Sequence, residues 1–163
     1  LSANQGSMQA QLNLGVMYKN GNGVRQDNNE AVKWFKLSAK QGFAIAQYSL
    51  GLMYQTGHGV LQDYKQAVDW YKLSADQGYN LAQLTLGRLY ASGELGSKDY
   101  VLAYKWFSMA SIEGNKDAER YKVKLEKIMS ASQIEKANEL TKDQNLKLSN
   151  SKQTKACTHQ PSF

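Results

Sequence analysis

Residues 10–42 read AQLNLGVMYKNGNGVRQDNNEAVKWFKLSAKQG, and the same pattern returns 36 positions later and again 36 positions after that. The shared positions are Ala10, Ala46 and Ala82; Gly15, Gly51 and Gly87; Tyr18, Tyr54 and Tyr90; and Trp34, Trp70 and Trp106. A period of this length is typical of a solenoid, in which each repeat buries its apolar face against its neighbours. Such a stack offers an extended surface, so binding is the function class that the pattern favours.

Each repeat predicts two helices. Apolar residues recur at helical spacing over residues 10–18 and again over residues 31–39. Gly15 interrupts the first helix, where glycine costs about 1 kcal/mol relative to alanine, so we expect the backbone of the second helix to pass too close for a Cβ. Trp34 and Phe35 follow the core-facing spacing of the second helix, and we expect both in the core because aromatic side chains bury a large apolar area.

The loop between the two helices carries end signals for both. Gly21 follows the first helix, where a residue with positive φ is most easily glycine. Asp27 then predicts the N-cap of the second helix, and Glu30 three residues later predicts a capping-box arrangement. In the later repeats the corresponding positions carry Gly57, Asp63 and Gln66, and then Gly93 and Asp99. In the third repeat the second loop glycine has moved by one place to Gly96, so we expect that loop to differ in shape.

The assembled motif is Ala-x-x-x-Leu-Gly-x-Met-Tyr, Gly-x-Gly-Val-x-x-Asp, and Ala-Val-x-Trp-aromatic-x-x-Ser-Ala-x-Gln-Gly. It resembles the Sel1-like repeat, a relative of the tetratricopeptide repeat, over about residues 1–120. The resemblance implies an all-α fold of antiparallel helix pairs, wound into a right-handed α-α superhelix with C-terminal capping helices. It also implies a bacterial scaffold that binds other proteins, and it implies no cofactor.

The motif divides the chain into six segments. They are the end of an upstream repeat (1–6), three full repeats (7–42, 43–78 and 79–114), a degenerate repeat with capping helices (115–144) and a disordered tail (145–163). Residues 1–6 match residues 37–42, so we expect at least one more repeat upstream and exposed apolar surface at the N-terminal face. Ser130 or Ser132 predicts the N-cap of the last helix, which we end near Asp143.

The charge and composition restrict the partner. The net charge is +6, of which +2 lies in residues 1–114 and +4 in residues 115–163, and we interpret this surplus as a solvated helix face and tail. A nucleic-acid binder more often concentrates basic residues on the repeat surface. The chain has no apolar run that would span a membrane. We therefore predict a protein or peptide partner, no nucleic acid, no membrane span and a monomer, and we leave the compartment open.

Catalytic and metal-binding signals are sparse. His58 lies in a glycine loop, and Cys157 and His159 lie near the C-terminus, so their spacing supports no metal set and no nucleophile-base pair. We therefore predict no catalytic residue, no metal and no cofactor. Some cysteine-rich Sel1-like relatives bind or hydrolyse β-lactams, but the paired cysteines of those relatives are absent here. A β-lactam enzyme and an anionic-surface or nucleic-acid binder acting through the basic C-terminal segment remain alternatives.

The predicted binding groove follows the exposed side of the first helix of each repeat. In the related tetratricopeptide architecture these helices line the concave surface. The groove positions are Leu12, Asn13, Val16 and Asn20; Tyr48, Ser49, Leu52 and Thr56; and Leu84, Thr85, Arg88 and Ser92. We expect Tyr48 and Arg88 to anchor the partner, because tyrosine and arginine are enriched among residues that dominate binding energy. The alternative is that Leu12, Leu52 and Leu84 pack against neighbouring helices.

Overall fold

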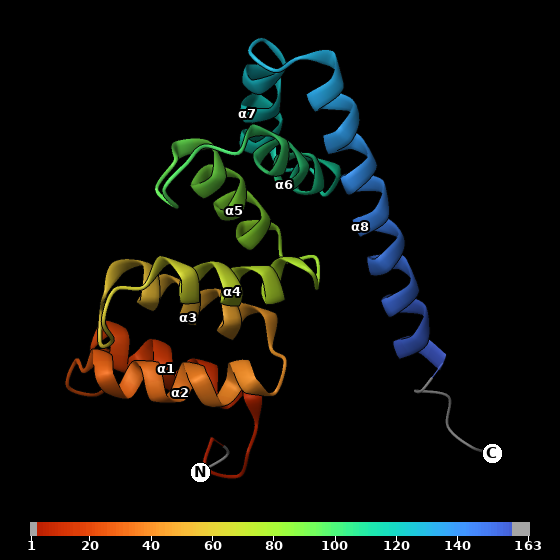
Figure 1. Cartoon of the computed structure of the whole chain (residues 1–163). Coiled ribbons are helices and arrows are strands. Elements are labelled where there is room, and N and C mark those ends of the chain that lie inside the picture. Colours follow the sequence, from red (N-terminus) through yellow and green to blue (C-terminus); the bar gives the residue numbers. More distant parts are fainter. Residues whose placement is uncertain (1–2, 158–163) are drawn as a thin grey trace. The chain divides into compact units, whose positions relative to one another are not determined.

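The computed structural model describes residues 3–157, which form eight helices and no strand (Figure 1). The helices are α1 (Met8–Asn20), α2 (Asn28–Lys40), α3 (Ala44–Thr56), α4 (Tyr64–Ala75), α5 (Asn80–Ser92), α6 (Tyr100–Ile112), α7 (Lys116–Glu126) and α8 (Ala131–Cys157). The chain divides into two compact units, of which unit 1 ends at Ala82 and unit 2 begins at Gln83. The predicted all-α fold of repeated helix pairs is confirmed.

Unit 1 contains two helix pairs of the same design. Helix α1 packs along α2, α3 packs along α4, and α2 joins the two pairs by packing on α3. Figure 1 shows α2 and α4 in front of α1 and α3, so the first helices of the repeats form one layer and the second helices form the other. One face of the α1 and α3 layer is therefore left for other contacts.

Aromatic rings fill the space beside the helix glycines. The ring of Phe35 would stand 2.6 Å from a Cβ on Gly15, and the ring of Tyr71 would stand at the same distance from a Cβ on Gly51. Our prediction named the second helix of the pair, which is right, but the nearest atoms belong to its aromatic side chain rather than its backbone. Gly15 and Gly51 leave room for these rings between the two helices of each pair. Phe35 and Tyr71 are therefore almost fully buried there.

The tryptophans are less uniform than the repeat predicts. Trp106 is buried, but Trp34 and Trp70 are only partly buried, and Trp70 packs at the margin of the unit 1 core. The aromatic residue that follows each tryptophan is the one that fills the core, as Phe35 and Tyr71 show. The prediction that all these aromatic residues are core is therefore correct for the second ring and only partly correct for the tryptophan.

The loops confirm the predicted helix ends and correct one detail. Gly21 has a φ of 74° after α1, and the carboxylate of Asp27 accepts hydrogen bonds from the backbone N–H groups of Asn29 and Glu30. A full capping box does not form, because the Asp27 N–H donates to the Tyr18 carbonyl at 2.9 Å. The Glu30 carboxylate instead pairs with Lys33. The loop backbone therefore ties α1 to the start of α2.

The N-terminal face of unit 1 exposes apolar surface, as expected. Leu50 and Met53 of α3 are 0% and 1% exposed, because α2 packs against that side of α3. The corresponding residues of α1 are Leu14, which is partly buried, and Met17, which is 36% exposed. Within residues 3–157 no helix pair precedes α1, so its equivalent face has no second layer to cover it.

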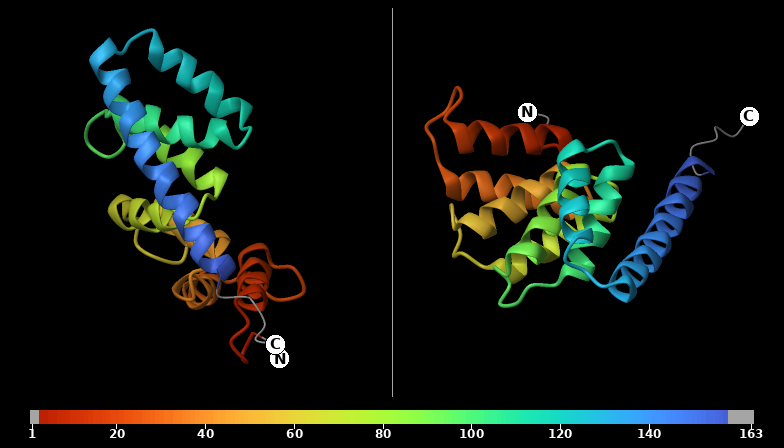
Figure 2. Two further views of the ribbon diagram at one scale, coloured as in Figure 1. Left: turned by 90° about the vertical axis from the view of Figure 1, so that its right-hand side faces the viewer. Right: turned by 90° about the horizontal axis from the view of Figure 1, so that it is seen from above.

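Unit 2 closes with two helices that do not repeat the earlier pairs. Helices α7 and α8 both pack on α6, and their apolar residues share one core cluster with it. Figure 2 shows α8 diverging from α7 rather than lying along it. Helix α8 begins with a complete capping box, in which Ser130 Oγ accepts from the Gln133 N–H and Gln133 Oε1 accepts from the Ser130 N–H. Ser130 is therefore the N-cap that the sequence left open between two serines.

The length of α8 corrects the predicted C-terminal boundary. The helix continues past Asp143, where we expected it to end, and reaches Cys157. No glycine or proline lies between residues 131 and 157 to stop it, and Leu148 is 7% exposed and so adds apolar burial beyond the predicted end. The predicted irregular tail is thus wrong for residues 145–157. Residues 158–163, including His159, lie outside the described residues.

Candidate functional site

The open side of the α1 and α3 layer forms one continuous stripe on each helix, which we call the outer stripe. Its positions follow the spacing i, i+4, i+7 and i+11, which keeps them on one helix face. On α1 they are Gln9, Asn13, Val16 and Asn20, and on α3 they are Ile45, Ser49, Leu52 and Thr56. None of these side chains carries a charge.

The polar groups of the outer stripe are mostly satisfied within their own helices. Gln9 Nε2 donates to Asn13 Oδ1 at 3.0 Å on α1. On α3 the Ser49 hydroxyl donates to the Ile45 carbonyl at 2.9 Å, and the Thr56 hydroxyl donates to the Leu52 carbonyl at 2.8 Å. A hydroxyl that already donates to its own helix turns its aliphatic part outward. The stripe is therefore uncharged and partly apolar.

Leu12 was predicted to line the groove, and this prediction is wrong because the residue is buried. It is only 6% exposed and belongs to the same core cluster as Leu50 and Met53 of α3. Its neighbours Asn13 and Val16 remain exposed, so the surface of α1 begins one position after Leu12. The packing alternative is therefore right for Leu12, whereas Leu52 stays partly exposed at the equivalent of Val16.

Tyr48 lies at the edge of the outer stripe and is partly buried by two other tyrosines. Its ring centre lies 5.5 Å from that of Tyr71 and 5.3 Å from that of Tyr79. Burial raises the pKa of both Tyr71 and Tyr79 above the ordinary tyrosine value, and the nearby Tyr48 adds to the effect. The hydroxyl of Tyr71 donates to Gln55 Oε1 at 2.7 Å. Tyr48 is therefore held in a fixed position and presents only one part of its ring.

The remaining predicted positions lie in unit 2 and form their own stripe on α5. Arg88 and Ser92 are exposed, Thr85 is partly exposed, and the hydroxyl of Ser92 donates to the Leu89 carbonyl at 3.1 Å. Leu84 is partly buried against the core cluster that α6, α7 and α8 share. The two predicted anchors therefore belong to different units, Tyr48 to unit 1 and Arg88 to unit 2.

The predicted groove omits two exposed apolar residues. Ile45 and Leu81 are 38% and 45% exposed, and they occupy the same position at the start of α3 and α5. Each lies four residues before a predicted groove residue, Ser49 or Thr85, so continuing the helical spacing toward the N-terminus would have found them.

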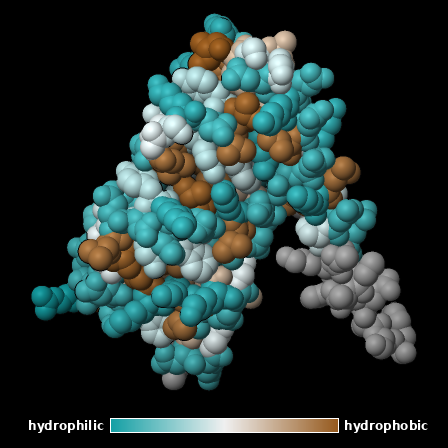
Figure 3. All heavy atoms as spheres, viewed as in Figure 1, coloured by the Kyte–Doolittle hydropathy of each residue, from teal (hydrophilic) through white to brown (hydrophobic). Residues whose placement is uncertain are grey.

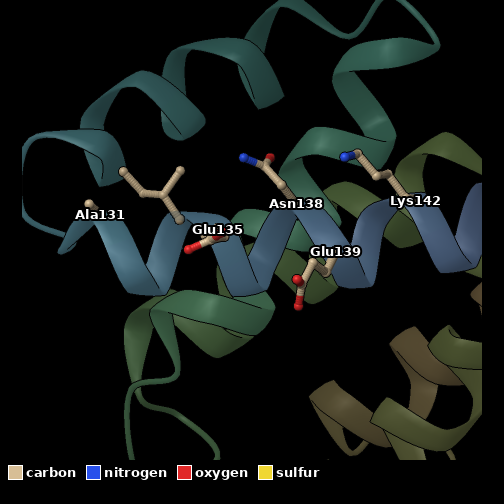
Figure 4. Close-up of a pocket in the computed structure, with 6 residues that line it drawn as sticks. Ala131, Glu135, Asn138, Glu139 and Lys142 are labelled. Carbon is tan, nitrogen blue, oxygen red and sulfur yellow. The ribbon is translucent and has the colours of Figure 1, made fainter.

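The surface of α8 carries a shallow depression lined by Ala131, Ile134, Glu135, Asn138, Glu139 and Lys142. Figure 4 shows Asn138 and Lys142 on one side of the helix and Glu139 on the other, so the polar groups do not converge on one point. Among the described residues, no three side chains of histidine, cysteine, aspartate or glutamate lie close enough together to hold a metal ion. None of the helices within residues 3–157 has the length and hydrophobicity needed to cross a bilayer.

Comparison with known proteins identifies the repeats. The Sel1 repeat model matches residues 9–43, 44–79 and 80–115. A Sel1 repeat protein from Oxalobacter formigenes shares 38% sequence identity, with a TM-score of 0.67 over 75% of this chain and 92% of that one. No curated protein is significantly similar in sequence.

A second solved structure is similar over almost the entire chain. It is c5321, described as a protective antigen of uropathogenic Escherichia coli strains with a Sel1-like repeat fold. The two share 32% identity with a TM-score of 0.81, over 99% of this chain and 35% of the c5321 chain. This chain thus spans about a third of the length of that relative. The family model covers more than half of the residues, and the chain belongs to the Sel1 repeat family.

Proposed function

We propose that this chain is a non-enzymatic scaffold that binds a peptide or protein segment along the outer stripe of α1 and α3. The observation that carries the proposal is the absence of charge from the whole stripe, in a chain in which 21% of the residues are charged. The centres of protein interfaces are depleted in charged residues. A repeat protein would otherwise be expected to cover an open helix face with lysine and glutamate.

The stripe also has the mixture of groups that a peptide needs. Val16 and Ile45 are each 38% exposed and offer apolar contacts. On α1, Asn13 and Asn20 add side-chain amides, and an amide can both donate and accept hydrogen bonds. Tyr48 is already held by Tyr71 and Tyr79, so its ordering on binding costs little further entropy. The favoured partner is an uncharged segment with apolar residues and free backbone amides.

A displayed library of random peptides tests the proposal. Peptides are selected on the full chain, and the dissociation constant of the tightest one is measured on Val16→Lys and on Leu52→Lys. A lysine placed in the stripe should weaken binding by about tenfold or more, because it must be desolvated without a partner. Leu61→Lys is the matched control, since Leu61 is 91% exposed in a loop of the same unit and its replacement should change binding less than about twofold. Failure to select any peptide, or selected peptides that ignore both stripe variants, would refute the proposal.

A further inference from the structure

Helix α8 shows what the outward face of a second helix can accept. This face of α6, which we call the α6 seat, contains Lys105, Ser108 and Met109. Helix α8 packs on α6, and Lys105 Nζ donates to Gln144 Oε1 of α8 at 3.3 Å. Ser108 and Met109 are 7% and 2% exposed. An amphipathic helix thus occupies the outward face of the third repeat within the same chain.

The equivalent faces in unit 1 are open. Leu37 of α2 and Leu73 of α4 stand 36 residues apart in the repeat, as Leu73 and Met109 do, and they are 47% and 48% exposed. Among the described residues of unit 1, no helix follows α2 or α4 in the way that α8 packs on α6. Figure 3, seen from the side of α2 and α4, shows a largely hydrophilic surface on unit 1 with separate hydrophobic side chains in it. Each of the two faces therefore carries an exposed leucine.

The two open faces differ in charge. Around Leu37 of α2 the charged positions on the same side of the helix are Glu30, Lys33, Lys36 and Lys40, which carry three positive charges and one negative charge. Lys33 pairs with Glu30 of the previous turn at 2.5 Å. Around Leu73 of α4 the corresponding positions are Gln66, Asp69, Lys72 and Asp76, which carry one positive and two negative charges. Only the α2 face therefore combines an exposed apolar residue with a positive surround.

We propose that the outward face of α2, formed by Lys33, Lys36, Leu37 and Lys40, docks an acidic amphipathic helix of a partner protein in the manner in which α8 occupies the α6 seat. This surface lies on the opposite layer from the outer stripe of α1 and α3, so it is a second site and does not depend on the first. Two features select the partner. An apolar residue of its helix covers Leu37, and carboxylates on the flanks of that residue meet the lysines.

The chemistry explains why the partner is acidic and not a second copy of α8. Residues 131–151 of α8 contain as many lysines as acidic residues, so this segment has no net attraction for a basic face. Lys36 and Lys40 are one turn apart, which places their ammonium groups within reach of carboxylates that are also one turn apart. Such pairs act mainly on association rate and specificity, while the cover over Leu37 supplies apolar burial.

Two matched peptides test this site on the full chain. The first is residues 131–151 as they stand, and the second is the same peptide with Lys136→Glu, Lys142→Glu and Lys147→Glu, which keeps the apolar face and makes the peptide acidic. Fluorescence anisotropy should show that the acidic peptide binds more tightly than the unmodified peptide, by about tenfold or more. Its affinity should fall as the salt concentration rises. Leu37→Ser and the pair Lys36→Glu with Lys40→Glu should each weaken this binding by about tenfold.

The control reverses two positive charges elsewhere in unit 1. It is the pair Lys19→Glu and Arg25→Glu, on the surface of α1 and in the loop that follows it. It should leave binding within about threefold of the wild type, since screening weakens distant charges. Because all these side chains are exposed, the variants should have the same melting temperature as the wild type, which circular dichroism can check. Binding that survives Leu37→Ser, or that the control pair abolishes equally, would overturn the proposal. Tighter binding of the unmodified peptide would also overturn it and would identify α8 of a second copy as the occupant.

Discussion

The loop glycine Gly59 lies directly against the backbone of Asn28, the first residue of α2. A Cβ on Gly59 would stand 2.5 Å from the carbonyl carbon of Asn28, and the φ of Gly59 is 74°. The second repeat therefore rests on the first through two backbones with no side chain between them. Gly23, at the same place in the first repeat, has the same φ but meets only the end of the Met17 side chain, at 3.6 Å.

This pair of glycines predicts unequal effects of the same substitution. Gly23→Ala and Gly59→Ala should both lose about 1–2 kcal/mol of unfolding free energy, because a Cβ disfavours positive φ. Gly59→Ala should lose about 1–3 kcal/mol more, because the Asn28 backbone has to move. Urea denaturation of both variants measures the difference. Equal losses would show that the contact between the repeats is not tight.

Tyr71→Phe should test the buried hydroxyl in the second repeat. Phe35 occupies the equivalent position in the first repeat, so the phenyl ring fits, and the change removes the hydrogen bond to Gln55. We expect the free energy of unfolding to fall by about 1 kcal/mol, as for the loss of a typical intramolecular hydrogen bond. Gln55→Met is the partner variant in a double-mutant cycle. A coupling free energy near zero would mean that the hydrogen bond between Tyr71 and Gln55 does not stabilise the fold.

The stability of unit 2 should fall at alkaline pH through Tyr104. Burial, together with the hydrogen bond to Glu126, raises the pKa of Tyr104 to about 12. The folded-state pKa lies above the unfolded value of about 10. The neutral Tyr104 hydroxyl therefore stabilises the fold fully below pH ~10, and this stabilisation is lost as the pH rises toward 12. Denaturation midpoints measured from pH 8 to pH 11.5 should fall more steeply for the wild type than for Tyr104→Phe. Parallel curves would contradict this prediction.

The start of α8 offers two serines for a matched comparison. Ser130→Ala removes the side-chain acceptor of the capping box and should cost about 1 kcal/mol. Ser132 is exposed in the first turn of the same helix, and Ser132→Ala should change stability by less than about 0.5 kcal/mol. Thermal melts followed at 222 nm compare the two. If Ser132→Ala were the more damaging change, the N-cap assignment would be wrong.

The local features of the repeat could be predicted because they depend on short-range chemistry. Gly21 has a positive φ and Asp27 caps α2, since each role depends only on the residue type and its near neighbours. The capping box at Asp27 was wrong for a reason that lies farther along the chain. The Tyr18 carbonyl takes the N–H that Glu30 would have accepted. Competition of this kind becomes visible only when both partners are placed in space.

Period and spacing were enough to recover the helix pairs and their ends, because every repeat follows the same local rules, and the residues of the motif carried the resemblance to the family. Which apolar residues meet water was decided by the packing of one pair on another. Leu12 is buried while Val16 is exposed, and Met17 is exposed while Met53 is covered. Burial depends on neighbours supplied by distant helices, and residues of the same type in the same repeat position can differ in them.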